Sequence, residues 1–70
     1  MSNWSAKRGR HVLSVLLHLG WEIKRQKGSH IVLEKSGSPN YVWSFRDSEE
    51  IGSRMLARIA KKTGLKPEDL

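Results

Sequence analysis

The 70-residue chain contains no cysteine, which excludes disulfide frameworks, thiolate zinc sites, iron–sulfur clusters and cysteine nucleophiles. It also has no long apolar run. The longest, from Val12 to Leu19, is interrupted by Ser14 and His18 and falls short of the about 18 apolar residues of a membrane span. No small-residue cleavage site follows it, as a signal peptide would require. The sequence therefore predicts a cytoplasmic protein with no membrane partner.

Carboxylates are scarce, with seven Asp and Glu against 13 Lys and Arg, which leaves a net charge of +6. Residues 1–28 hold six of the cations against Glu22 alone, so five of the six net charges lie in this part. Such a surplus favours an acidic partner, and phosphate-rich nucleic acid is as good an interpretation as a merely solvated surface. A chain this short forms one small domain without a large substrate cavity.

The apolar pattern predicts a helix followed by three strands. Apolar residues recur at helical spacing up to Leu19, and Gly20 stands where a helix-ending glycine belongs, so we expect a helix over about residues 9–19. Residues 1–7 are expected to form a loosely ordered arm. The expected strands, separated by glycine-containing turn signals, are residues 21–26, 30–34 and 40–45.

A second helix is expected near the C-terminus. Asp47 followed by Glu50 resembles a capping box that would open it, and Gly64 is placed to close it, with Leu65 packing back beyond. Residues 67–70 fit a last short turn. The order helix, three strands, helix predicts an α+β two-layer sandwich, in which both helices cover one face of a three-stranded antiparallel sheet.

The aromatic residues Tyr41, Trp43 and Phe45 alternate along the third expected strand and therefore share one face. A small domain needs that buried area, so we interpret them as core residues. The alternative is an exposed aromatic surface, because alternation alone does not say which face the helices cover.

His30 is the histidine with the most suggestive neighbours. It follows Gly28 and Ser29, with Arg25 and Lys27 just before. Histidine moves protons near neutral pH, and cations or amide donors can hold the phosphorane oxygens formed when RNA is cut by its own 2′-hydroxyl. From spacing alone, a polar histidine at a strand end remains the favoured interpretation.

No metal site is expected elsewhere in the sequence. His11 and His18 are seven residues apart in one helix, roughly 10 Å at ~1.5 Å per residue, so one metal ion cannot bind both. Asp47, Glu49 and Glu50 are explained by their place near a helix start, where the helix dipole favours acidic residues.

The turn Lys27-Gly28-Ser29-His30 and its surroundings resemble the HicA (YcfA-like) family of toxin mRNA interferases. The likeness runs from about Arg8 to Leu70: Gly9 opening an apolar helix, Gly20-Trp21 ending it, a basic strand, the Lys-Gly-Ser-His turn, and a last helix closing with Gly64-Leu65. The chain departs from the family at Trp43-Ser44-Phe45-Arg46, where members often carry a proline and a nearby histidine. It also has Arg54-Met55 in place of a common Gly-Thr.

The resemblance implies a double-stranded-RNA-binding-domain-like fold over residues 8–70. It also implies metal-independent mRNA cleavage in a stress-related toxin–antitoxin system, with no cofactor and with a HicB-like antitoxin as partner. It places the catalytic histidine on His30 and the family's Gly-Ser on Gly28 and Ser29. We add Arg25 and Lys27 as candidate RNA phosphate contacts.

Two other functions fit the residues. A non-catalytic RNA-binding module of the same fold would use the basic patch for recognition, although Glu49 and Glu50 stand where a duplex-binding module would be expected to carry cations. The other is a protein-interaction domain whose basic face meets an acidic partner.

Overall fold

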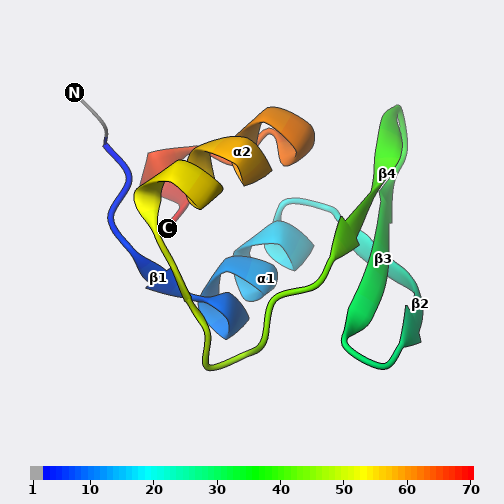
Figure 1. Cartoon of the computed structure of the whole chain (residues 1–70). Helices are drawn as coiled ribbons and strands as arrows, with labels where there is room; N and C mark the ends of the chain where they lie inside the picture. The colour runs from blue at the N-terminus through cyan, green and yellow to red at the C-terminus, as the bar shows by residue number, and fades with distance from the viewer. Residues whose placement is uncertain (1–2) are drawn as a thin grey trace.

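The computed structural model describes residues 3–70 and shows an α+β fold of two helices and a three-stranded antiparallel sheet (Figure 1). A second, two-stranded pairing joins the start of the chain to the segment before the last helix. In chain order the elements are β1 (Lys7–Arg8), α1 (Gly9–His18), β2 (Glu22–Lys27), β3 (His30–Lys35), β4 (Ser38–Trp43), β5 (Glu50–Ile51), α2 (Ser53–Thr63) and a 3-10 turn (Pro67–Asp69).

The first helix ends as its sequence predicts. Gly20 has a φ of 104°, and its N–H donates to Leu17 O while that of Trp21 donates to Leu16 O. These are the two hydrogen bonds of a Schellman motif. Leu16 and Trp21 are both buried, which adds the apolar contact that accompanies this ending and directs the chain into β2.

The predicted hairpin of the first two strands is confirmed. Lys27 and His30 face each other across the Gly28-Ser29 turn. Gly28 has a φ of 59°, whereas Ser29, like every residue within 3–70 that is not a glycine, does not have a positive φ. A positive φ at the first central residue only is typical of a type II′ turn, which matches the twist of the strands and favours glycine there.

The third strand differs in its bounds from the predicted 40–45. It begins at Ser38 and ends at Trp43, so Pro39 lies inside it. The sheet order is β2-β3-β4, which makes β4 an edge strand, and an edge tolerates a residue without an N–H donor. The aromatic stripe faces the helices as predicted: Trp43 is buried, and Tyr41 and Phe45 pack against the core.

The predicted helix start at Asp47 is wrong. Residues 46–49 form a turn, in which the Arg46 N–H donates to Glu49 Oε1 and the Glu49 N–H to Arg46 O. Glu50 then pairs with Arg8 in the β1–β5 ladder. Helix α2 begins only at Ser53, with no side-chain cap on Gly52.

One hydrophobic core holds the two layers together. Helix α2 ends at Thr63, Gly64 caps it with a φ of 79°, and Leu65 beyond the cap is buried. Trp21 Nε1 donates to Thr63 O at 3.2 Å, which ties the start of the sheet to the end of α2. The buried apolar residues are Val12, Leu16, Trp21, Leu33, Trp43, Ile51, Leu56, Ile59 and Leu65.

The expected N-terminal arm is described from Asn3 onward, and its last residue, Lys7, pairs with Ile51.

Within residues 3–70, neither helix has the length and apolar character needed to cross a bilayer.

Candidate functional site

The site lies on the outer face of the sheet, the face turned away from the helices. Along β3, Ile31 and Leu33 pack inward, so His30, Val32 and Glu34 point the other way. His30 is exposed at the first position of β3. The strand alternation thus presents its imidazole to solvent at the turn end of the hairpin.

A break in the β2–β3 register brings two cations to the same face. Ile23 pairs with Leu33, but Arg25 already pairs with Val32, so the register shifts by one residue at Lys24. Such a bulge reverses which side chains face the core beyond it. Without it Arg25 would share the inward face of Ile31; with it, Arg25 and Lys27 lie on the outer face beside His30.

These side chains surround an open depression of about 450 Å³, lined by Arg25, Lys27, His30 and Val32. Lys27 is directly opposite His30, and Arg25 is opposite Val32. Facing residues of an antiparallel pair have Cβ atoms about 4.5–5.5 Å apart. The depression therefore combines two permanent cations, one imidazole and one apolar wall.

Of the five site residues predicted from the sequence, the structure groups Arg25, Lys27 and His30 around this depression. Gly28 and Ser29 form the adjoining turn and do not line it. Both residues are exposed. Val32 was not among the predicted residues, although strand alternation from His30 would have placed it on the same face.

Charge is divided along the outer face of the hairpin. The cations lie at the turn end, whereas Glu22 and Glu34 face each other at the opposite end. Those carboxylates border a separate hollow with Lys35, Ser36 and Asn40. An anion approaching this face is therefore directed toward Arg25 and Lys27.

The other histidines lie outside this cluster. His11 Nε2 donates to Leu70 O at 3.1 Å, and His18 is exposed in the last turn of α1. Among residues 3–70 no three or more histidine and carboxylate side chains are grouped as metal ligands would be. Asp47 instead contributes its backbone oxygen, which accepts the Arg10 N–H.

The arrangement can bind an anion and transfer a proton beside it. An exposed imidazole can take a proton from a hydroxyl or give one to a leaving oxygen, and the adjacent cations can neutralise charge on a phosphate. Because the depression is open, it can accept a polymer lying across the surface.

Comparison with known protein families finds one match to this chain. The family described as HicA toxin of bacterial toxin-antitoxin matches residues 9–65, which include both helices, the whole three-stranded sheet and every residue of the depression. No curated protein matches the chain.

Proposed function

Because the chain belongs to the HicA toxin family of bacterial toxin–antitoxin systems, we propose that it is an endoribonuclease that cleaves mRNA at the depression around His30. The family membership brings with it an RNA substrate and an antitoxin partner in general terms. The proposal adds the site, the role of each residue and independence from metal ions.

The proposed reaction uses the RNA's own 2′-hydroxyl as nucleophile. The 2′-oxygen bonds to phosphorus while the bond from phosphorus to the 5′-oxygen breaks, leaving a cyclic phosphate and a 5′-hydroxyl end. His30 either accepts the proton from the 2′-hydroxyl, with water donating a proton to the departing 5′-oxygen, or donates that proton itself, with water accepting the one from the 2′-hydroxyl. No electron leaves the substrate, so no redox partner is needed.

The neighbouring residues stabilise charge in this proposal. Arg25 and Lys27 neutralise the phosphate oxygens as negative charge builds up in the transition state. The backbone N–H groups of Gly28 and Ser29, at the rim, donate to the same phosphate or to the next one along. Val32 supplies an apolar surface for a ribose or base.

The proposed protein partner is a HicB-like antitoxin. The site is open and lies on the face of the sheet that the helices leave uncovered, so one protein docked there would exclude RNA. Co-expression with the product of an adjacent reading frame should relieve growth arrest if that product is the antitoxin.

The observation that carries the proposal is the convergence of Arg25, Lys27 and His30 on one open depression within the region that matches a toxin family. A polar histidine at a strand end needs no cations facing it. Here the bulge at Lys24 puts both cations on the face of the sheet that carries the imidazole.

The direct test is His30→Ala, compared with His18→Ala as a control that removes an exposed histidine outside the site. Purified proteins are incubated with RNA in EDTA, and folding is checked by circular dichroism. Losing a general acid or base should slow cleavage about 10²–10⁴-fold, while His18→Ala should cleave at the wild-type rate. Cleavage at the wild-type rate by folded His30→Ala would refute the assignment.

A further inference from the structure

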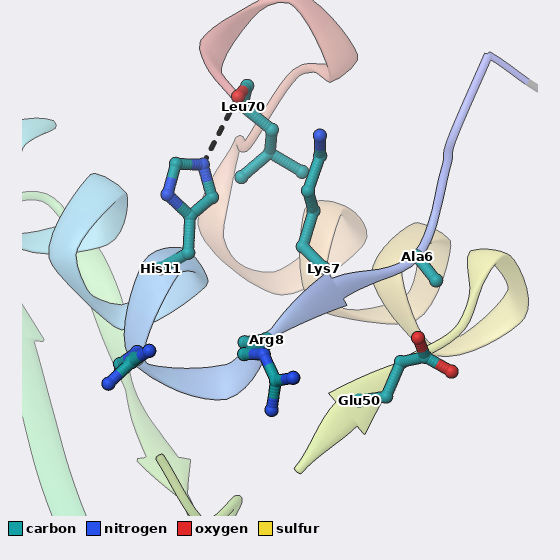
Figure 2. A pocket seen from close by; sticks show the side chains of 7 residues that line it. Ala6, Lys7, Arg8, His11, Glu50 and Leu70 are labelled. Atoms are coloured by element: carbon teal, nitrogen blue, oxygen red, sulfur yellow. Dashed lines mark hydrogen bonds between the residues drawn. The ribbon is translucent and has the colours of Figure 1, made fainter. Parts of the chain in front are cut away.

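A second group of basic side chains lies where β1 leads into α1. It surrounds an open pocket, whose lining is drawn in Figure 2 and whose volume is about 430 Å³. The basic residues of its lining are Lys7, Arg8, Arg10 and His11. Glu50 is the one carboxylate side chain among its lining residues, against three permanent cations. The pocket is therefore net positive and attracts anions.

The cationic groups are available to a ligand. Arg8 Nη1 donates to Ser48 O at 3.3 Å, and His11 Nε2 donates to Leu70 O, the contact drawn in Figure 2. Both acceptors are backbone oxygens, which leave the positive charge of the arginine unneutralised. Arg8 and Arg10 are exposed and Lys7 is half-buried.

The side chains, rather than the end of the helix, would hold the ligand. The first two amides of α1 are already used, since the Gly9 N–H donates to Glu49 O at 2.8 Å and the Arg10 N–H to Asp47 O at 3.1 Å. The first turn of α1 contains no acidic residue to compete for the cations.

We propose that Lys7, Arg8 and Arg10 form a second phosphate-binding site, which holds the RNA backbone at a distance from the phosphate that is cut. The proposal rests on the RNA substrate proposed above. Guanidinium groups present paired donors that match phosphate oxygens, and Arg8 and Arg10 supply two of them.

The placement of the charge favours RNA over an acidic protein as the ligand. Five of the six cations in residues 1–28 line one of the two sites: Lys7, Arg8 and Arg10 here, and Arg25 and Lys27 on the sheet. In Figure 1 the start of α1 and the β2–β3 turn both lie in the lower part of the view, the first on the side of the helices and the second at the lower end of the sheet. The longest dimension of the molecule is 34 Å, so a strand of several nucleotides is long enough to run over the surface from one site to the other.

The test measures binding without cleavage. A labelled single-stranded 2′-O-methyl RNA lacks the nucleophile, so wild-type protein can be titrated with it by fluorescence anisotropy at several salt concentrations. In the double variant Lys7→Gln and Arg10→Gln, the logarithmic salt slope should fall by about 0.7 for each lost phosphate contact. The affinity should drop uniformly across RNA sequences.

The matched control is Lys61→Gln with Lys62→Gln, which removes the same charge from exposed positions in the last turn of α2. Arg10→Lys, which keeps the charge, should retain the wild-type slope. If the Lys7 and Arg10 double variant and the control show the same slope and affinity, the second site is refuted. This result would leave the His30 cleavage test unaffected.

A polyglutamate of equal charge serves as the competing ligand. Binding to it should be much weaker than to RNA and indifferent to the Lys7 and Arg10 substitutions. If polyglutamate binds as tightly as RNA and loses as much affinity in the double variant, the pocket is a site for acidic protein, and the RNA proposal is wrong.

Discussion

The two faces of the three-stranded sheet are made by alternate residues of the same strands, yet they serve different ends. On β4, Trp43 is 1% exposed beneath the helices, while its neighbour Val42 is 52% exposed on the outer face. On β3, Leu33 is buried and His30 lies in the open. The inner face supplies the buried apolar area on which a small domain depends, and the outer face is left free for charge.

The difference between the faces also depends on a local irregularity. Strict alternation would have turned Arg25 inward with Ile31, and the shift at Lys24 turns it outward. A bulge leaves one residue out of the ladder, and here it assembles a cluster that the regular pattern would have divided between the faces. The comparison predicts that stability depends on the shape of the inner face, and that the function proposed for the site depends on the charge of the outer face.

The largest expected effect comes from Trp43→Ala on the inner face. Removing a buried tryptophan leaves a cavity and should lower the free energy of unfolding by about 3–5 kcal/mol, much of the total for a domain of this size. Val42→Ala, one residue away on the outer face, should change it by less than about 0.5 kcal/mol. Urea denaturation followed by circular dichroism measures both.

If Trp43→Ala does not fold, Trp43→Phe keeps an aromatic ring at the position and gives a measurable midpoint. Trp43 and Phe45 meet edge to face with ring centroids 4.9 Å apart, so Trp43→Phe should also be destabilised. Equal losses for the Trp43 and Val42 variants would end the distinction between the faces.

A smaller effect is expected at the turn beside the outer cluster. Gly28 has a φ of 59° with open space around it, so Gly28→Ala meets no steric clash with neighbours but places a side chain in the left-handed region. That strain should cost roughly 1–2 kcal/mol. Ser29→Ala, at the next position and without a positive φ, is the control and should unfold at nearly the wild-type midpoint. If Gly28→Ala and Ser29→Ala unfold at the same midpoint, the positive φ at position 28 costs the alanine variant no stability, and the prediction is wrong.

The smallest expected effect is a change in the pH dependence of stability, caused by Tyr41 on the inner face. Burial raises the pKa of the Tyr41 phenol, so the unfolded chain releases this proton first, near pH 10. The stability that this raised pKa contributes is complete below that pH and is lost as pH rises through the folded pKa. Wild-type stability should therefore fall more steeply than that of Tyr41→Phe above about pH 10, as followed by denaturation across that range. If the stability of the wild type and that of Tyr41→Phe fall equally with rising pH, the phenol is not buried in the folded state.

Local sequence signals were enough for most of the fold. Gly20 and Gly64 ended the two helices where expected, and the Gly28 turn defined the first hairpin. The start of α2 was missed because the spacing of Asp47 and Glu50 fits a capping box, whereas Glu50 pairs with Arg8, about forty positions away. A two-residue ladder between distant segments leaves no periodic pattern to detect.

The site could be predicted in composition but not in geometry. Proximity in sequence was enough to group Arg25, Lys27 and His30, but the face they occupy depends on the bulge at Lys24. A signal existed in the unbroken polar run of residues 24–27, which shows no inward apolar position. The pocket at the start of α1 could not be predicted from the sequence, because Glu50 and Leu70, which lie far along the chain, complete its lining.

Both outer strands of the sheet discourage self-association. An unpaired strand edge is a template for another chain, and proteins protect such edges with proline or with lysine and arginine. Strand β4 carries Pro39, which offers no N–H to an incoming strand, and β2 carries Lys24, Arg25 and Lys27. Two copies meeting along β2 would bring these like charges together. Two of these charges, Arg25 and Lys27, are also the ones proposed to hold RNA, so replacing them with neutral residues should make the protein less soluble as well as less active.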